Sequence, residues 1–93
     1  MVKHSVMYNF KEGVNKDEAI VIIRDALVPL VGKIPGLRHL EVQLTFQGMD
    51  YALYSEFDSK EALVNYAEHP LHQAAKEKFF HLLDSRVVAD YEL

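Results

Sequence analysis

Apolar and polar residues alternate along the first ten positions of the chain. From about Val2 to Phe10, one side of the alternating pattern holds apolar residues and one histidine, namely Val2, His4, Val6, Tyr8 and Phe10. A period of two residues predicts a β-strand with one face toward a core. The first predicted element is therefore a half-buried strand.

A longer period follows and predicts a helix. Asn15, with Glu18 three residues later, is typical of a helix start in which side chains cap free backbone N–H groups. Apolar residues then recur every three or four positions, which predicts a buried stripe. The stripe consists of Ile20, Ile23, Leu27, Leu30 and Val31. Because Pro29 removes a helical hydrogen bond, we expect a kink or break between Asp25 and Val28.

The rest of the chain predicts three more strands and a second helical region. The strands are expected at about Leu37–Phe46, Tyr51–Phe57 and Arg86–Glu92, with a hairpin turn at Gln47–Asp50. A helix is expected over about Ser59–Glu68, with Asp58 as its N-cap and Glu61 as the partner in a capping box. The helical pattern breaks at His69–Pro70 and continues to about Leu83. Four residues near its end are expected in the core, Phe79, Phe80, Leu82 and Leu83.

Two strand–helix–strand units in succession predict an α+β protein, a ferredoxin-like βαββαβ protomer. Its antiparallel sheet carries both helical segments on one face, because the crossovers are right-handed. The other face would expose a mixture of polar and apolar residues, Ser5, Met7, His39, Glu41, Ala52 and Tyr54. This mixture is too apolar for full hydration and too polar for a monomer core. Two copies that face each other would cover it, which predicts a homodimer.

Composition and charge exclude several classes of partner. The 93 residues predict a single domain, 1–93, and the net charge of -4 provides no basic surface for nucleic acid or an anionic membrane. The densest apolar stretch, Ala19 to Ile23, is too short to span a bilayer. The absence of cysteine excludes disulfides and fits a reducing compartment. We therefore expect a cytoplasmic protein that binds neither nucleic acid nor membrane.

The run from Tyr66 to His72 places two imidazoles and a phenol around a helix break. Pro70 disfavours the α region at His69 and suits the first position of a new helix. His72 then falls in the first turn of that helix, where the positive end of the helix dipole disfavours an imidazolium. A neutral imidazole can accept a proton, so the run predicts a site with a general base. No glycine-rich phosphate loop or Ser-His-Asp order accompanies it, and we expect no cofactor.

Five segments spread along the chain form a recognisable series, namely Val2–His4, Gly32–Gly36, Ser55–Ser59, His69–His72 and Val87–Tyr91. In this order they resemble one known family, the stress-responsive dimeric α/β-barrel (Dabb) domain, and the resemblance covers essentially the whole chain. The resemblance implies a ferredoxin-like protomer and a homodimer that forms a dimeric α/β barrel. The family is functionally mixed. Some plant members are induced by stress, and one branch contains polyketide cyclases of the olivetolic acid cyclase type.

The resemblance to the cyclase branch also implies roles for individual residues. In that branch a histidine matching His72 serves as the base, a tyrosine matching Tyr66 assists it, and a histidine matching His4 lines the pocket. Tyr51 stands where the branch has another pocket histidine, so the pocket here is expected to differ in polarity. The resemblance therefore implies His72 and Tyr66 as catalytic residues. It also implies a ligand site walled by His4, Tyr51, Tyr66 and His72.

Each of these side chains also has a purely structural interpretation. His72 can brace its helix against the sheet, Tyr66 can be a core aromatic, and His4 can be a core histidine with one hydrogen bond. His69 and His72 are three residues apart, and Glu68 would add an oxygen ligand. Because a catalytic metal site usually needs three protein ligands in fixed geometry, we expect no metal here.

Three functions remain open from the sequence. The first is a binding or stress-related protein that holds a small, partly apolar ligand without turnover. The second is a cofactor-free enzyme that acts next to a carbonyl, as in an intramolecular aldol cyclisation. In it, His72 would remove the α-proton and Tyr66 would orient the base or donate to the enolate oxygen. The third, indicated by the dimeric barrel architecture alone, is a cofactor-free oxygenase.

Overall fold

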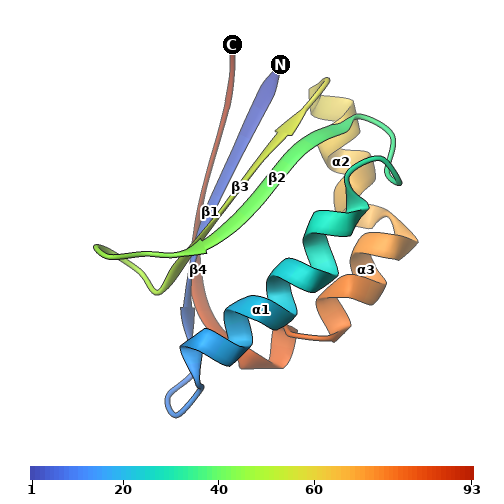
Figure 1. Cartoon of the computed structure of the whole chain (residues 1–93). Coiled ribbons are helices and arrows are strands. Elements are labelled where there is room, and N and C mark those ends of the chain that lie inside the picture. The colour runs from blue at the N-terminus through green and yellow to red at the C-terminus, as the bar shows by residue number, and fades with distance from the viewer.

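The computed structural model describes all residues, 1–93, and shows four strands with helices on one side (Figure 1). The strands are β1 Val2–Phe10, β2 Leu37–Leu44, β3 Tyr51–Phe57 and β4 Leu83–Glu92. The helices are α1 Lys16–Leu27, α2 Lys60–Glu68 and α3 Pro70–Glu77, and short 3₁₀ turns cover Val28–Leu30 and Phe80–Leu82. The strand order is β2-β3-β1-β4, and every neighbouring pair is antiparallel. The predicted ferredoxin-like α+β fold is confirmed.

The alternation of β1 sets its two faces as predicted. Val2, Val6 and Phe10 are buried beneath the helices. Val6 lies opposite Leu53 of β3 and opposite Val88 of β4, so these three residues share the helix-facing side of the sheet. His4 and Tyr8 belong to the same side, because they stand two residues from Val6.

Helix α1 follows its sequence signals closely. The Asn15 side chain accepts a hydrogen bond from the Glu18 backbone N–H at 3.0 Å, which confirms the predicted cap. Ile23 and Leu27 of the predicted stripe are fully buried. The helix ends at Leu27, and a 3₁₀ turn holds Pro29, as the expected break requires. Val31 was wrongly placed in the buried stripe: it lies beyond the turn and is 37% exposed.

The start of α2 differs from the expected one by one residue. Ser59, not Asp58, is the N-cap, and its hydroxyl accepts the Ala62 N–H at 3.1 Å. Asp58 instead accepts two hydrogen bonds from the Arg38 guanidinium, at 2.7 and 2.8 Å. The bidentate ion pair holds the pKa of the Asp58 carboxyl below its usual range. The competing ion pair therefore explains why the adjacent serine takes the cap.

Three expected element ends were wrong. β2 stops at Leu44 and leaves Phe46 fully exposed in the loop, where the Thr45 N–H bonds to the Asp50 carbonyl at 3.1 Å. α3 stops at Glu77 instead of continuing to about Leu83, because backbone bonding shifts to a three-residue spacing at Lys78. The residues beyond it form a 3₁₀ turn, and β4 begins at Leu83.

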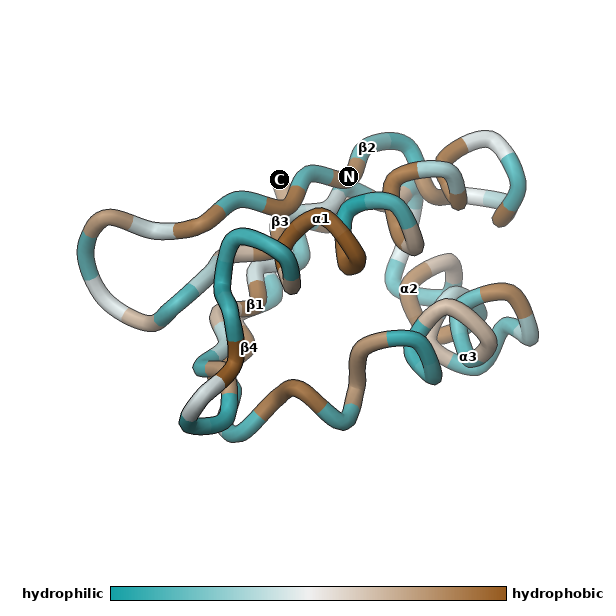
Figure 2. The backbone as a smooth tube through the Cα atoms, turned by 60° about the horizontal axis from the view of Figure 1, so that its bottom comes forward, coloured by the Kyte–Doolittle hydropathy of each residue, from teal (hydrophilic) through white to brown (hydrophobic).

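The change in hydrogen-bond spacing after α3 places two neighbouring aromatic residues in different environments. Phe79 is buried, whereas Phe80, which was expected in the core, is 61% exposed. Helix α1 combines hydrophobic and hydrophilic positions along its turns (Figure 2), as suits a helix with one buried side.

None of the helices has both the length and the apolar character that a membrane-spanning segment needs.

The helical layer does not bury all of the sheet. Beyond Leu83, which is half-buried, every residue of β4 is exposed. Its register with β1 places Arg86, Val88 and Asp90 on the helix-facing side, opposite Tyr8, Val6 and His4. That incompletely covered side borders the candidate site.

Candidate functional site

A cavity of about 380 Å³ lies between the β1–β4 side of the sheet and helices α2 and α3. Eleven of its 16 lining residues are hydrophobic, including Val6, Leu53, Leu63 and Phe79. The remaining five are polar or charged, namely His4, His72, Lys76, Arg86 and Asp90. A mostly apolar hollow with a few polar groups is the usual form of a small-molecule site.

The helix break puts the His72 ring at this cavity. The His69 side chain caps α3 by accepting the Leu71 N–H at 3.1 Å, and Pro70 occupies the first helical turn. His72 therefore lies in that turn, as predicted. Its Nδ1 is 3.3 Å from the Ala67 carbonyl oxygen. Because a carbonyl can only accept, Nδ1 carries the hydrogen and Nε2 is left as the acceptor of the neutral ring.

The surroundings of His72 favour the neutral imidazole. Burial lowers the pKa of His72 below its ordinary value, and the nearby Lys76, His4 and His69 lower it further. The hydrogen bond to Ala67 opposes this shift without cancelling it. The direction agrees with the prediction from sequence, and the leading cause is loss of solvent around the ring.

Tyr66 packs directly against His72. Their ring centroids are 4.1 Å apart with planes tilted by 35°, and the Tyr66 ring centroid also lies 5.0 Å from that of Phe57. The Tyr66 side chain is buried, which raises the pKa of its phenol well above the ordinary range. The phenol therefore keeps its proton at neutral pH and can donate a hydrogen bond to a molecule in the cavity.

His4 reaches the cavity from β1 and pairs with Asp90 of β4. Its Nδ1 lies against the Asp90 carboxylate, directly across the strand pair. The ring also meets Phe57 edge to face at 6.2 Å. Since the carboxylate accepts from Nδ1, His4 also presents Nε2 as its free acceptor when the ring is neutral.

Tyr51 does not line the cavity, which corrects the expected wall. Its ring is fully buried and stacks between Tyr8 and Phe10, with centroid distances of 5.0 Å to each. Its hydroxyl is buried and has no hydrogen-bond partner. Tyr8 lines the cavity in its place, and the Tyr51 ring is packed against that of Tyr8.

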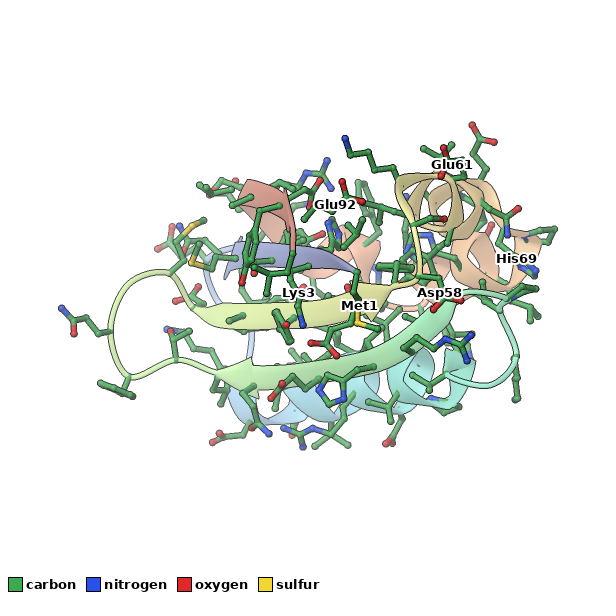
Figure 3. The ribbon with its side chains drawn as sticks, turned by 90° about the horizontal axis from the view of Figure 1, so that it is seen from above. Met1, Lys3, Asp58, Glu61, His69 and Glu92 are labelled. Atoms are coloured by element: carbon green, nitrogen blue, oxygen red, sulfur yellow. The ribbon has the colours of Figure 1, made fainter.

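The alternative weighed above, a metal site made of His69, His72 and Glu68, does not form as a group of three ligands. His69 Nδ1 is occupied by the cap of α3, and Figure 3 shows this residue at the outer end of the helices, away from Lys3 on the strands. No group of three or more histidine and carboxylate side chains is arranged to hold a metal ion.

Three charged residues of the lining were missed from the sequence. Lys76 stands four residues after His72 on α3, so helical spacing was an available signal. Arg86 and Asp90 alternate with Val88 along β4, and a pattern with charges on the inward side gives no local sign of a cavity. The structure thus brings His4, Tyr66 and His72 together with these three residues, while their roles remain predictions.

Comparison with known proteins identifies a family model and a relative that match nearly the whole chain. A family model described as "Stress responsive A/B Barrel Domain" (Dabb) matches residues 2–93. A stress-response A/B barrel domain-containing protein of Arabidopsis thaliana is 30% identical over 96 residues, which cover 98% of this chain and 88% of that protein.

Two solved structures show the same fold. A dimeric protein of unknown function and ferredoxin-like fold from Bacteroides fragilis superposes with a TM-score of 0.88 at 34% identity, covering 99% of this chain and 95% of that one. A hydroxynitrile lyase from Passiflora edulis has a TM-score of 0.80 at 20% identity, with coverage of 97% and 90%. The second likeness is one of fold alone.

Proposed function

This chain belongs to the stress-responsive A/B barrel (Dabb) family, and from that premise we propose that it is a homodimeric protein that binds a small, partly apolar molecule. The observation that carries the proposal is the apolar cavity of about 380 Å³ with a neutral phenol and a neutral imidazole at its wall. The apolar lining supplies affinity through burial of the ligand's hydrocarbon surface. Tyr66 and His72 supply a hydrogen-bond donor and acceptor that orient its polar end.

The open face of the sheet supports the homodimer. It combines the His39–Glu41 pair at 3.0 Å with a hydrogen bond from the Tyr54 hydroxyl to Glu56 at 2.7 Å. Val87 on β4 belongs to the same face and is 52% exposed. Satisfied polar groups beside exposed apolar ones are typical of an interface between protein copies. The related Bacteroides fragilis protein is itself described as dimeric.

Binding is tested with octanamide, a neutral molecule with an apolar chain and a polar head. Calorimetry on the wild-type protein should give saturable binding. Replacing Val88, which faces the cavity, with tryptophan should fill the space and weaken the affinity at least about tenfold. Val21→Trp on the exposed side of α1 is the matched control and should change affinity less than about twofold. Equal losses in the two folded variants, or no binding at all, would refute the cavity as the site.

The homodimer is tested by light scattering, which should give twice the chain mass of 10.7 kDa at micromolar concentration. Tyr54→Asp places a second carboxylate beside Glu56 on the open face and should shift the assembly toward monomer. Val21→Asp, which adds the same charge on α1, should leave the mass unchanged. A wild-type monomer at these concentrations would end the dimer proposal.

A second candidate function, proton abstraction next to a carbonyl as in a polyketide cyclase, is favoured by one specific arrangement. His72 combines a lowered pKa with an Nε2 that is free to accept a proton. The Tyr66 ring centroid lies 4.1 Å from that of His72, and its phenol retains its proton. A base and a donor side by side are what enolate formation requires. The hydroxynitrile lyase with the same fold agrees with an enzymatic use of this architecture.

The catalytic candidate predicts exchange of α-hydrogens. The wild-type protein should speed the loss of deuterium from α-deuterated 4-phenyl-2-butanone, followed by NMR. His72→Ala should lower that rate by roughly 10²–10⁴-fold and Tyr66→Phe by less, because the tyrosine only assists. A folded His72→Ala protein with an unchanged rate would remove His72 from any such mechanism.

A further inference from the structure

Two cations line the cavity without a charged partner from the protein. Lys76 on α3 and Arg86 on β4 take part in none of the six ion pairs of the structure. Lys76 is half-buried, and its ammonium lies 5.5 Å from the centre of the Phe80 ring. Arg86 extends from the opposite wall, on the strand that pairs with β1. The two positive charges therefore come from different elements and border the same hollow.

This concentration of positive charge contrasts with the rest of the chain. The protein carries a net charge of -4, yet the only carboxylate in the cavity lining is that of Asp90. The Asp90 carboxylate is already engaged by His4. Low-dielectric walls that carry one sign of charge strengthen the field inside a cleft and attract ions of the opposite sign. An apolar cavity with two free cations is thus suited to a ligand that brings its own negative charge.

We propose that the cavity selects small apolar molecules that carry one anionic group, such as a carboxylate, with that group held by Lys76 and Arg86. The apolar part of the molecule lies against Val6, Leu53 and Leu63. Arg86 offers the planar pair of N–H donors that fits a carboxylate, and Lys76 acts as a point charge from the other wall. This inference rests on the proposed binding function and names the chemical class of its ligand.

The experiment compares octanoate with octanamide, which share chain length and differ in charge. Calorimetry should show that the wild-type protein binds octanoate about tenfold more tightly than octanamide, a gain in the range of charge-assisted hydrogen bonds at partly exposed positions. Arg86→Gln and Lys76→Gln should each reduce this ratio at least about threefold, and the double variant should bring it close to one. Lys78→Gln is the matched control. It removes the same charge from an exposed position near the end of α3, outside the cavity, and should leave the ratio within about twofold.

The possible outcomes separate this inference from the function on which it rests. Tight octanamide binding with no preference for octanoate overturns the anion inference and leaves the binding function intact. A preference that Lys78→Gln weakens as much as Lys76→Gln overturns it too, because the preference then follows overall charge. If neither molecule binds, the binding function and the anion inference both fail. Unchanged melting temperatures in the four variants ensure that the ratios report on the cavity.

Discussion

The helix-facing side of the sheet has two unlike halves. Over β2 and β3, helix α1 is packed so tightly that Ile23, Leu27 and Val42 are at most 1% exposed. Over β1 and β4, the same face opens into a cavity, and Val88 is 38% exposed. The strands on both halves alternate in the same way, so alternation alone does not decide whether a face becomes core.

The difference follows from which residues occupy the helix-facing positions of β3 and β4. On β3, the positions that face the helices are Tyr51, Leu53, Ser55 and Phe57, all buried. On β4, the corresponding positions alternate a valine with two charged residues, Arg86 and Asp90. Charged side chains without enough partners cannot be enclosed in a core, because the free energy needed to desolvate them exceeds the stabilisation from the surrounding apolar contacts. The β4 half therefore stays open, and the opening is where a ligand has room.

The largest expected contrast between the halves is in stability. Leu27→Ala removes a side chain from the packed half and should lower the free energy of unfolding by about 2–5 kcal/mol. Val88→Ala in the cavity half should lower it by less than about 1 kcal/mol, because the space beside this side chain is already empty. Urea denaturation of both variants measures this. Equal losses would show that the two halves are packed alike.

A smaller effect of opposite sign is expected at the border between the halves. Tyr51 is fully buried with an unpaired hydroxyl, and a buried polar group without a partner is destabilising. Tyr51→Phe should therefore raise the free energy of unfolding by about 1 kcal/mol. Tyr8→Phe, at the half-exposed neighbour that lines the cavity, should change it by less than about 0.5 kcal/mol. A loss of stability in Tyr51→Phe would mean that its hydroxyl has a partner in solution.

The smallest effect concerns the dependence of stability on pH. The pKa of His72 is lowered in the folded protein, so below about pH 6.5 the unfolded chain binds the extra proton first. Stability should consequently decline as the pH falls through this value, and His72→Gln should make that decline shallower. In an NMR titration, Lys76→Gln should raise the pKa of His72, and Lys78→Gln should not. A pKa of His72 above about 6.5 in the wild-type protein would contradict the account.

Much of the fold was readable from local patterns. The alternation of β1, the Asn15 cap and the break at His69–Pro70 each depend on residues close in sequence, and each was confirmed. Asp58 was taken for a cap because its partner Arg38 is distant along the chain. Local rules could not include that competing contact.

Only part of the site could be predicted from the sequence, again because local rules do not include contacts between distant segments. His72 and Tyr66 stand on either side of one helix break, so their proximity followed from sequence. Tyr51 was misplaced because its ring is covered by Tyr8 and Phe10 of β1, a strand that is distant along the chain. The cations were missed because Lys76 and Arg86 lie on different elements. They line the same cavity only once β4 has paired with β1.

The most direct test of the account is a map of where octanamide binds, made from backbone NMR shifts during a titration. The account predicts the largest shifts at Val88 and His72, on the two walls of the cavity, and small shifts at Ile23 beneath α1. Shifts that saturate together at the cavity residues would support the division of the sheet into a packed half and a binding half. Saturable shifts centred on α1, with none at the cavity, would contradict it.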